Sequence, residues 1–249
     1  MTADALISTA DGVMRITMNR SAKKNALTGP MYDAMTAAME QADASDDIRA
    51  IVLEGSGGSF TAGNDLADFL ATATRGEENR AGYFIRKIAT LDTPIVAAVD
   101  GVAVGVGTTL LFHCDLVYAT PAAKFRMPFL DLGLVPEAAS SILAPARFGM
   151  AKASQYILLA EAFGPQEAEA LGLVNAIVAP DALADTAMEA ARKLAAKPPA
   201  ALRAARRLMR GDRKDIVAAM DRETVAFAEA LRSDEAKAAF MSFLNKAKG

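Results

Sequence analysis

Hydrophobic and polar positions in the first half of the chain alternate between two patterns. Short runs rich in Val, Ile and Leu have the length and composition of β-strands, and the longer segments between them repeat their apolar positions with the spacing of helices. The predicted strands are Val13–Met18, Ala50–Glu54, Ile95–Val99 and Asp115–Ala119, and the predicted helices between them are Pro30–Ala44 and Gly82–Leu91. This alternation of strands and helices predicts an α/β core.

The pattern becomes helical throughout from Pro180 onward. The expected helices are Asp181–Ala196, Pro198–Arg210, Arg213–Leu231 and Asp234–Lys246. Two prolines in Lys197–Ala200 separate the first two helices, because a proline and the residue before it are poorly accommodated inside a helix. We therefore expect a core at residues 1–195 and a helical C-terminal region at residues 196–249.

Composition and charge limit the kinds of molecule that the protein is expected to bind. The chain has 249 residues, 52% of them hydrophobic, and a formal net charge of -3. A chain of this charge lacks the basic surface that binding a phosphate backbone requires, so we expect no nucleic-acid partner. The apolar stretches Pro94–Val106 and Leu110–Ala119 are too short to span a bilayer. The single Cys114 cannot form an internal disulfide, and the N-terminus lacks the pattern of a secretory signal, so a cytoplasmic location is expected.

Four arginines recur at helical spacing in the C-terminal region. Arg203, Arg206, Arg207 and Arg210 lie on one face of a predicted helix. Such a stripe is typical of a solvated helix surface, and it is also a place where a phosphate-bearing ligand binds. Both interpretations stay open at this stage.

Two glycine-containing corners follow predicted strands and precede predicted helices. The first is Ser59–Leu66, with sequence SFTAGNDL, and it leads into a predicted helix at Asp65–Ala71; the second is Asp100–Leu110, with sequence DGVAVGVGTTL. Each offers unpaired N–H groups at a helix start, and its glycines allow a ligand to approach the backbone closely. Ordinary turn chemistry explains either corner alone. The second corner does not fit a dinucleotide site, because its glycine spacing differs from G-x-G-x-x-G and no acidic residue ends a later strand at the required distance.

Several motifs in a fixed order carry a resemblance to a known family. They are NRSAKKNAL, SFTAGNDLADF, IVAAVDGVAVGVGTTLLFHCDLVYAT, AKFRMPFLDLGLVPEAASS and FGPQEAEALGLVNAIV. Together they cover nearly the whole chain and resemble the crotonase (enoyl-CoA hydratase/isomerase) family. The resemblance implies an α/β spiral of ββα repeats with a helical C-terminal region that builds trimers, often paired as dimers of trimers. It also implies an acyl-CoA thioester as substrate, with coenzyme A as part of that substrate and no separate cofactor.

The resemblance places an oxyanion hole on the two glycine corners. Its donors would be the backbone N–H of Asn64, after Gly63, and the backbone N–H of Val106, after Gly105. Donors of this kind contribute about 3 kcal/mol each, because they are aimed at the charge that develops on the thioester oxygen. The resemblance also implies substrate or CoA contacts at Lys23, Lys24, Ala26, Ala62, Gly63, Asp65, Leu66, Gly105, Thr109 and Phe129. For Lys23 and Lys24, a solvent-exposed loop is the alternative interpretation.

One carboxylate, Glu137, distinguishes between the reactions that the resemblance allows. The two glutamates of the hydratases would fall on Thr109 and Phe129, and neither side chain is a carboxylate base. Glu137 falls where a subgroup of 3,2-trans-enoyl-CoA isomerases keeps its single catalytic glutamate. Apolar neighbours, among them Phe129, are expected to raise its pKa. Alternatively, Glu137 simply opens a helix at Glu137–Ala146, where the helix dipole favours a carboxylate.

Isomerisation of a 3-enoyl-CoA, with Glu137 as acid and base, is the favoured function. A hydratase-like or other reaction of the same fold, including thioester hydrolysis, stays open, with Asp131 as a spare carboxylate for it. A loop position is the favoured interpretation of Asp131. A non-catalytic acyl-CoA binder is the third hypothesis. Asp65 is expected to cap the first corner. His113, the only histidine, is expected to be structural, and without a second histidine or a cysteine cluster no metal site is expected.

Overall fold

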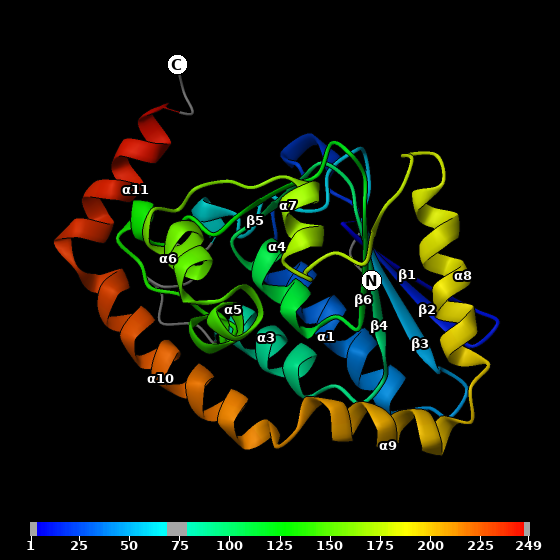
Figure 1. Ribbon diagram of the computed structural model, residues 1–249. Helices are drawn as coiled ribbons and strands as arrows, with labels where there is room; N and C mark the ends of the chain where they lie inside the picture. Colours follow the sequence, from blue (N-terminus) through cyan, green and yellow to red (C-terminus); the bar gives the residue numbers. More distant parts are fainter. Residues whose placement is uncertain (1–3, 69–78, 247–249) are drawn as a thin grey trace.

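The computed structural model of the protein describes residues 4–68 and 79–246 (Figure 1). In this part of the chain, six strands form one sheet in the order β1-β2-β3-β4-β6-β8. They are β1 (Ala5–Ala10), β2 (Val13–Met18), β3 (Ala50–Gly55), β4 (Ile95–Val99), β6 (Leu116–Ala119) and β8 (Ala176–Ile177). Only the pairing of β1 with β2 is antiparallel, and each later pair in this sheet is parallel. The short strands β5 (Val102–Val104) and β7 (Lys124–Arg126) pair in a second sheet.

Helices cover both faces of the larger sheet. Helices α1 (Gly29–Ala44) and α3 (Arg80–Thr90) lie on one face, and α8 (Leu183–Ala195) lies on the other (Figure 1). Alternate side chains of a strand point to opposite faces, so one strand supplies both layers. In β3, Ile51 and Leu53 belong to the core beside α1, whereas Val52 packs with the residues of α8. The predicted α/β core is therefore confirmed.

Short helical elements complete the core and carry the chain past the sheet. They are η1 (Ser21–Lys23), α4 (Val106–Thr109), η2 (Leu110–His113), η3 (Leu130–Leu132), α5 (Ser140–Phe148), α6 (Met150–Leu158) and α7 (Pro165–Ala170). Each predicted strand and helix of the core exists within two residues of its expected bounds, with two exceptions. The helix at Asp65–Ala71 is helical at residues 66–68 and otherwise lies outside the described residues. The helix considered at Glu137–Ala146 begins three residues later, at Ser140. The pattern missed β1, β5, β7 and β8, because they are short or lie at a sheet edge and lack a clear apolar run.

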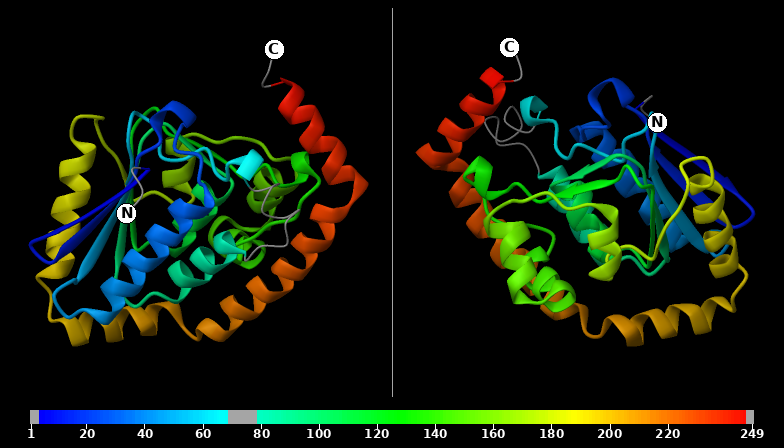
Figure 2. Two further views of the ribbon diagram at one scale, coloured as in Figure 1. Left: turned by 180° about the vertical axis from the view of Figure 1, so that it is seen from behind. Right: turned by 45° about the horizontal axis from the view of Figure 1, so that its top comes forward.

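The chain from Pro180 to residue 246 is helical apart from its connections, as predicted. Helix α9 (Pro199–Arg210) passes below the amino ends of β4 and β6, and α10 (Arg213–Arg232) then packs along α3 and α5 (Figures 1 and 2). Helix α11 (Asp234–Lys246) ends the described chain. The division at residues 195 and 196 stays a prediction. Among the described helices, none combines the length and the apolar character that crossing a membrane requires.

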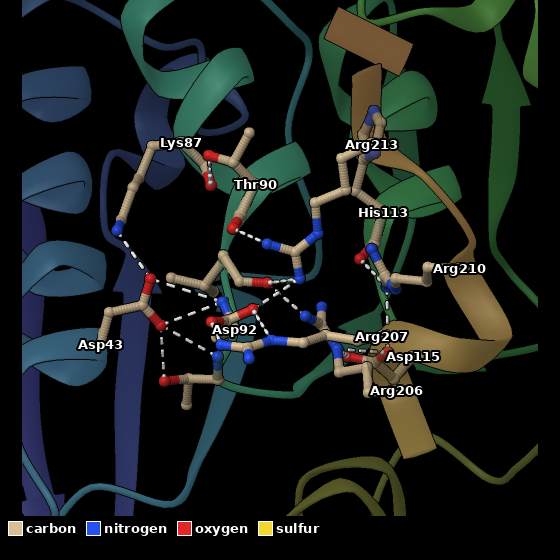
Figure 3. A network of polar contacts seen from close by, with 12 residues as sticks. Asp43, Lys87, Thr90, Asp92, His113, Asp115, Arg206, Arg207, Arg210 and Arg213 are labelled. Carbon is tan, nitrogen blue, oxygen red and sulfur yellow. Dashed lines mark hydrogen bonds and ion pairs between the residues drawn. The ribbon is translucent and has the colours of Figure 1, made fainter. Parts of the chain in front are cut away.

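Ion pairs attach α9 and the start of α10 to the loops that precede β4 and β6 (Figure 3). The guanidinium Nε of Arg206 lies 2.8 Å from one carboxylate oxygen of Asp115, and Nη2 of Arg210 lies 3.0 Å from the same oxygen. Arg207 and Arg213 pair with Asp92, and these contacts lower the pKa of Asp92 to about 2. Arg206 is only 5% exposed, so the solvated-face interpretation is wrong for this residue, and its guanidinium binds a carboxylate of the protein rather than a ligand phosphate.

Candidate active site

The two glycine corners lie side by side in the structure. The Thr61 N–H donates to Val102 O at 2.9 Å, and the Val104 N–H donates to Thr61 O at 3.0 Å. Gly63 has a φ of +87°, and a Cβ at this position would lie 2.7 Å from Val104 O. Glycine is therefore required at position 63 both by its backbone conformation and by the close approach of the second corner.

Each corner presents an N–H group with no protein acceptor among the described residues. Leu27 pairs with the peptide groups on either side of Asn64, accepting from Asp65 N–H and donating to Gly63 O, both at 2.8 Å. Val106 is the first residue of α4, and the first N–H groups of a helix have no intrahelical partner. The N–H groups of Asn64 and Val106 thus have the hydrogen-bonding capacity that an oxyanion hole needs, and their predicted role stays a prediction.

Asp65 caps the first corner, as predicted. One of its carboxylate oxygens accepts from the N–H groups of Ala67 and Asp68 at 3.1 Å each, and the other accepts from Arg20 at 2.7 Å. Burial would raise the pKa of Asp65, but the hydrogen bonds from Arg20 and the backbone outweigh it, so the pKa lies below its usual value. An ionised Asp65 therefore fixes the chain directly after Asn64.

The carboxyl group of Glu137 is almost surrounded by protein. The Thr109 hydroxyl donates to its Oε1 at 2.5 Å, and its Oε2 is buried without a hydrogen-bond partner in the described part of the chain. Burial raises the pKa of Glu137 to about 8; the Thr109 hydrogen bond opposes this rise, and the negative charge of Glu223 adds to it. A carboxyl group with this pKa can both accept and return a proton near neutral pH.

Glu137 does not open a helix, so the helix-dipole interpretation is wrong. Helix α5 begins at Ser140, and the two residues between adopt positive φ angles, 58° at Ala138 and 56° at Ala139. This left-handed turn redirects the chain between Glu137 and the helix. The turn, rather than a helix start, determines where the Glu137 side chain lies.

Glu137 and Asn64 line the same cavity, which has a volume of about 780 Å³. The cavity lies among α1, α3 and α10, and much of its wall is apolar, including Leu27, Tyr32, Ile85, Met220, Phe227 and Leu231. Pockets of this size accommodate small organic ligands, and an apolar wall suits an acyl chain. The structure therefore places the predicted base and one predicted oxyanion donor at one cavity.

The other predicted contact residues surround this region at different depths. Lys23 and Lys24 are exposed, and the Lys24 carbonyl accepts from Ala62 N–H at 2.8 Å, which joins the first loop to the first corner. Ala26, Ala62, Leu66 and Gly105 are partly buried, and Gly63 is buried. None of these residues lines the described cavity, so their predicted contacts with substrate or CoA stay predictions.

Thr109, Phe129 and Asp131 clarify the question of a second base. Thr109 is fully buried and binds Glu137 instead of facing the cavity, and Phe129 belongs to the hydrophobic core. Asp131 is exposed and forms an ion pair with Arg126 at 2.6 Å, and it is not part of the cavity wall. The interpretation of Asp131 as a spare carboxylate in this cavity is therefore wrong.

His113 has the structural role that was predicted. It is 3% exposed, and burial lowers its pKa to about 4, so the ring is neutral at physiological pH. Its Nε2 lies 2.8 Å from the carbonyl oxygen of Ala138, which can only accept, so Nε2 carries the proton. His113 thus supports the turn that follows Glu137.

Tyr32 and Glu223 also line the cavity, and the sequence reasoning missed both. The Tyr32 hydroxyl donates to Oδ1 of Asn64 at 2.5 Å, and this hydrogen bond orients the Asn64 side chain. Burial and the charge of Glu137 raise the pKa of Tyr32. Glu223 is 7% exposed and lies on the same face of α10 as Met220 and Phe227. A carboxylate within the apolar stripe of an amphipathic helix is the signal that could have indicated Glu223.

The raised pKa predicts that Glu137 destabilises the protein at alkaline pH. The folded protein holds this proton more tightly than the unfolded chain, so stability is lost as pH rises from about 4.5, and the loss is complete above about 8. We expect Glu137→Gln, which stays neutral, to be more stable than wild type at pH 9 by a few kcal/mol, and nearly equal at pH 5. Urea unfolding at both pH values measures this. The burial argument would be contradicted if the stability of Glu137→Gln depended on pH in the same way as that of wild type. The control is Glu229→Gln, which changes an exposed glutamate on α10.

Comparison with known proteins assigns the chain to a family. Residues 8–249 match the enoyl-CoA hydratase/isomerase family. Enoyl-CoA delta isomerase 2 of Rattus norvegicus is 35% identical over 97% of this chain, which spans 63% of the rat protein. The short-chain-enoyl-CoA hydratase of Clostridium acetobutylicum is 31% identical over 94% of this chain and 91% of that relative. The crystal structure of an enoyl-CoA hydratase/isomerase from Pseudoalteromonas atlantica T6c has a TM-score of 0.92 and 39% identity, and the match covers 98% of this chain and 97% of that one.

The structure has the α/β crotonase fold with a helical C-terminal region. The chain belongs to the enoyl-CoA hydratase/isomerase family. Isomerases and hydratases are similar to this chain at comparable sequence identity, so family membership does not determine which of the two reactions is catalysed.

Proposed function

We propose that the protein converts a 3-enoyl-CoA into the 2-trans-enoyl-CoA, with Glu137 as the acid and base. The observation that carries this proposal is the Glu137 carboxyl group at the cavity, which has a pKa near 8 and one buried oxygen without a hydrogen-bond partner among the described residues. The similarity to enoyl-CoA delta isomerase 2 supports the same reaction.

The reaction needs one base and two backbone donors. Glu137 removes a proton from C2, and the electron pair of that C–H bond moves toward the thioester oxygen, where the N–H groups of Asn64 and Val106 stabilise the negative charge. The protonated Glu137 then delivers its proton to C4 of the dienolate. The C3–C4 double bond becomes a single bond and a C2–C3 double bond forms, so the substrate gains and loses no atoms overall.

A hydratase needs a second group to hold and activate water, and among the described residues of the cavity wall the other buried carboxylate is Glu223. Both oxygens of Glu223 already accept hydrogen bonds, from the Ala139 N–H at 2.6 Å and from the Ser141 N–H at 3.0 Å. These contacts leave Glu223 poorly suited to activate water. Isomerisation through Glu137 alone is thus the better match to the site.

Paired substrate assays test the proposal. We expect the purified protein to convert 3-hexenoyl-CoA into its conjugated 2-enoyl isomer, measured as the increase in absorbance of the conjugated thioester, with little loss of crotonyl-CoA. Hydration of crotonyl-CoA with 3-hexenoyl-CoA untouched would show a hydratase, and release of free CoA would show thioester hydrolysis. Binding of both thioesters without turnover would show a non-catalytic binder.

The remaining parts of the proposal concern the assembly and the location of the protein. We propose a trimer, or a dimer of trimers, built by the helical C-terminal region, and a cytoplasmic location. Exposed apolar side chains on α9, Leu208 at 84% and Met209 at 87%, support self-association. Sedimentation analysis of the purified protein measures the assembly state.

A further inference from the structure

The turn between Glu137 and α5 is strained, and residues distant in sequence stabilise it. Ala138 and Ala139 both have positive φ, a conformation that disfavours any side chain, including that of alanine. Such strain persists only where surrounding contacts compensate for it. The contacts come from two elements that are distant in sequence from the turn, η2 and α10.

The contact from α10 is made by Glu223. Its Oε2 accepts from the Ala139 N–H at 2.6 Å, and its Oε1 accepts from the Ser141 N–H at 3.0 Å and from the Ser141 hydroxyl. Burial raises the pKa of Glu223 above its usual value, and the three donors oppose this rise, because each hydrogen bond is strengthened by the charge of the ionised carboxylate. From η2, His113 donates to the Ala138 carbonyl at 2.8 Å.

We propose that Glu223 is a positioning residue for Glu137, and that its carboxylate holds the left-handed turn at Ala138 and Ala139 that directs the Glu137 carboxyl group into the cavity. The inference rests on the proposed role of Glu137 as the proton-exchanging group. Glu223 acts through the turn, and both of its oxygens are bound to protein donors.

The charge of Glu223 has a second effect on Glu137. Two neighbouring carboxyl groups do not both ionise easily, and the one with more donors retains the charge. Among the described residues, three donors bind Glu223 and one, the Thr109 hydroxyl, binds Glu137, so the proton resides on Glu137. Among the described residues, the other ionisable groups at the cavity come from several elements. They are Asp68, which follows the first glycine corner, Tyr32 on α1, Arg80 and Arg86 on α3, Arg232 on α10 and Lys237 on α11. Loss of the Glu223 charge is therefore expected to let Glu137 ionise at lower pH.

Variants of Glu223 separate position from charge. Glu223→Gln removes the charge and places an amide NH₂ against a backbone N–H donor, so it impairs both functions. Glu223→Asp keeps the charge but shortens the reach to the turn. Glu229→Gln makes the same change of charge as Glu223→Gln at an exposed position of the same helix and is the matched control.

Two readouts test the proposal, kcat and KM for 3-hexenoyl-CoA and the infrared C=O stretch of protonated Glu137 as a function of pH. The infrared band is assigned by its loss in Glu137→Gln. We expect Glu223→Gln to lower kcat by about 10–100-fold, with a smaller change in KM, and to move the infrared midpoint to lower pH. Glu223→Asp should lower kcat while the midpoint stays near that of wild type, and Glu229→Gln should change neither.

Several outcomes would overturn the proposal. If Glu223→Gln folds and has the kcat and the infrared midpoint of wild type, the proposal is wrong. If Glu223→Gln does not fold, a wild-type kcat in Glu223→Asp overturns the proposal instead. The infrared titration needs no turnover, so it distinguishes this inference from the proposed function. A wild-type protein that does not isomerise but shows the shifted midpoint in Glu223→Gln would end the isomerase proposal and support the effect of the Glu223 charge on Glu137.

Discussion

Replacement of Glu137 by glutamine is expected to lower kcat for 3-hexenoyl-CoA by about 10²–10⁴-fold, because the amide cannot accept the proton from C2. The substitution preserves the shape of the side chain, and the Thr109 hydroxyl can still donate to the amide oxygen at the place of Oε1. Binding of hexanoyl-CoA, measured by calorimetry, should therefore be retained. Formation of the conjugated thioester measures the loss of turnover.

Asp131→Asn is the matched control for this experiment. Asp131 is a carboxylate six residues earlier in the chain, but it is exposed and paired with Arg126 outside the cavity. We expect this variant to keep the wild-type rate. Turnover that survives in Glu137→Gln but disappears in Asp131→Asn would overturn the assignment of Glu137 as the base and return Asp131 to consideration.

Gly63→Ala is expected to lower kcat by about 10²–10³-fold, the effect of losing one oxyanion-hole donor. The new Cβ would lie 2.7 Å from Val104 O, so the two corners would have to move apart and carry the N–H groups of Asn64 and Val106 with them. The positive φ of +87° adds strain, so the free energy of unfolding should fall by about 1–3 kcal/mol. Steady-state kinetics and urea unfolding measure the two effects.

Gly172→Ala separates strain from crowding. Gly172 has a φ of +72°, and a Cβ at this position would meet no atom within 4 Å. Its alanine variant should lose some stability but retain the wild-type kcat. Equal kcat in Gly63→Ala and wild type would contradict an oxyanion hole built from these two corners, whichever reaction the protein catalyses.

Local features of the sequence predicted a large part of the fold. The strands β2, β3, β4 and β6 and the helices α1 and α8 to α11 were expected within two residues of their bounds, because apolar periodicity and proline positions act over a few residues. Asp65 was expected to cap the first corner for the same reason, since a capping carboxylate binds N–H groups two and three residues ahead. The strand β8, with two residues, is too short to carry such a signal.

The candidate site was only partly predictable. The resemblance to the crotonase family, applied to positions 109, 129 and 137, implied a single proton-exchanging carboxylate, and the structure places Glu137 at a cavity with Asn64. The helix expected at Glu137 was wrong, because two alanines adopt left-handed φ angles that local propensity disfavours. The contacts that hold this turn come from residue 223, 84 positions from Ala139, which no local pattern connects.

By itself, the sequence determined four strands of the larger sheet, the helices α1, α3 and α8 to α11, the positions of the glycine corners and the identity of the carboxylate at position 137. The tertiary structure alone decided which side chains meet at the cavity, that Arg206 is buried against Asp115, and that burial raises the Glu137 pKa to about 8. Local elements depend on neighbours in the chain, whereas burial, desolvation and ion pairing depend on elements that folding brings together from distant positions.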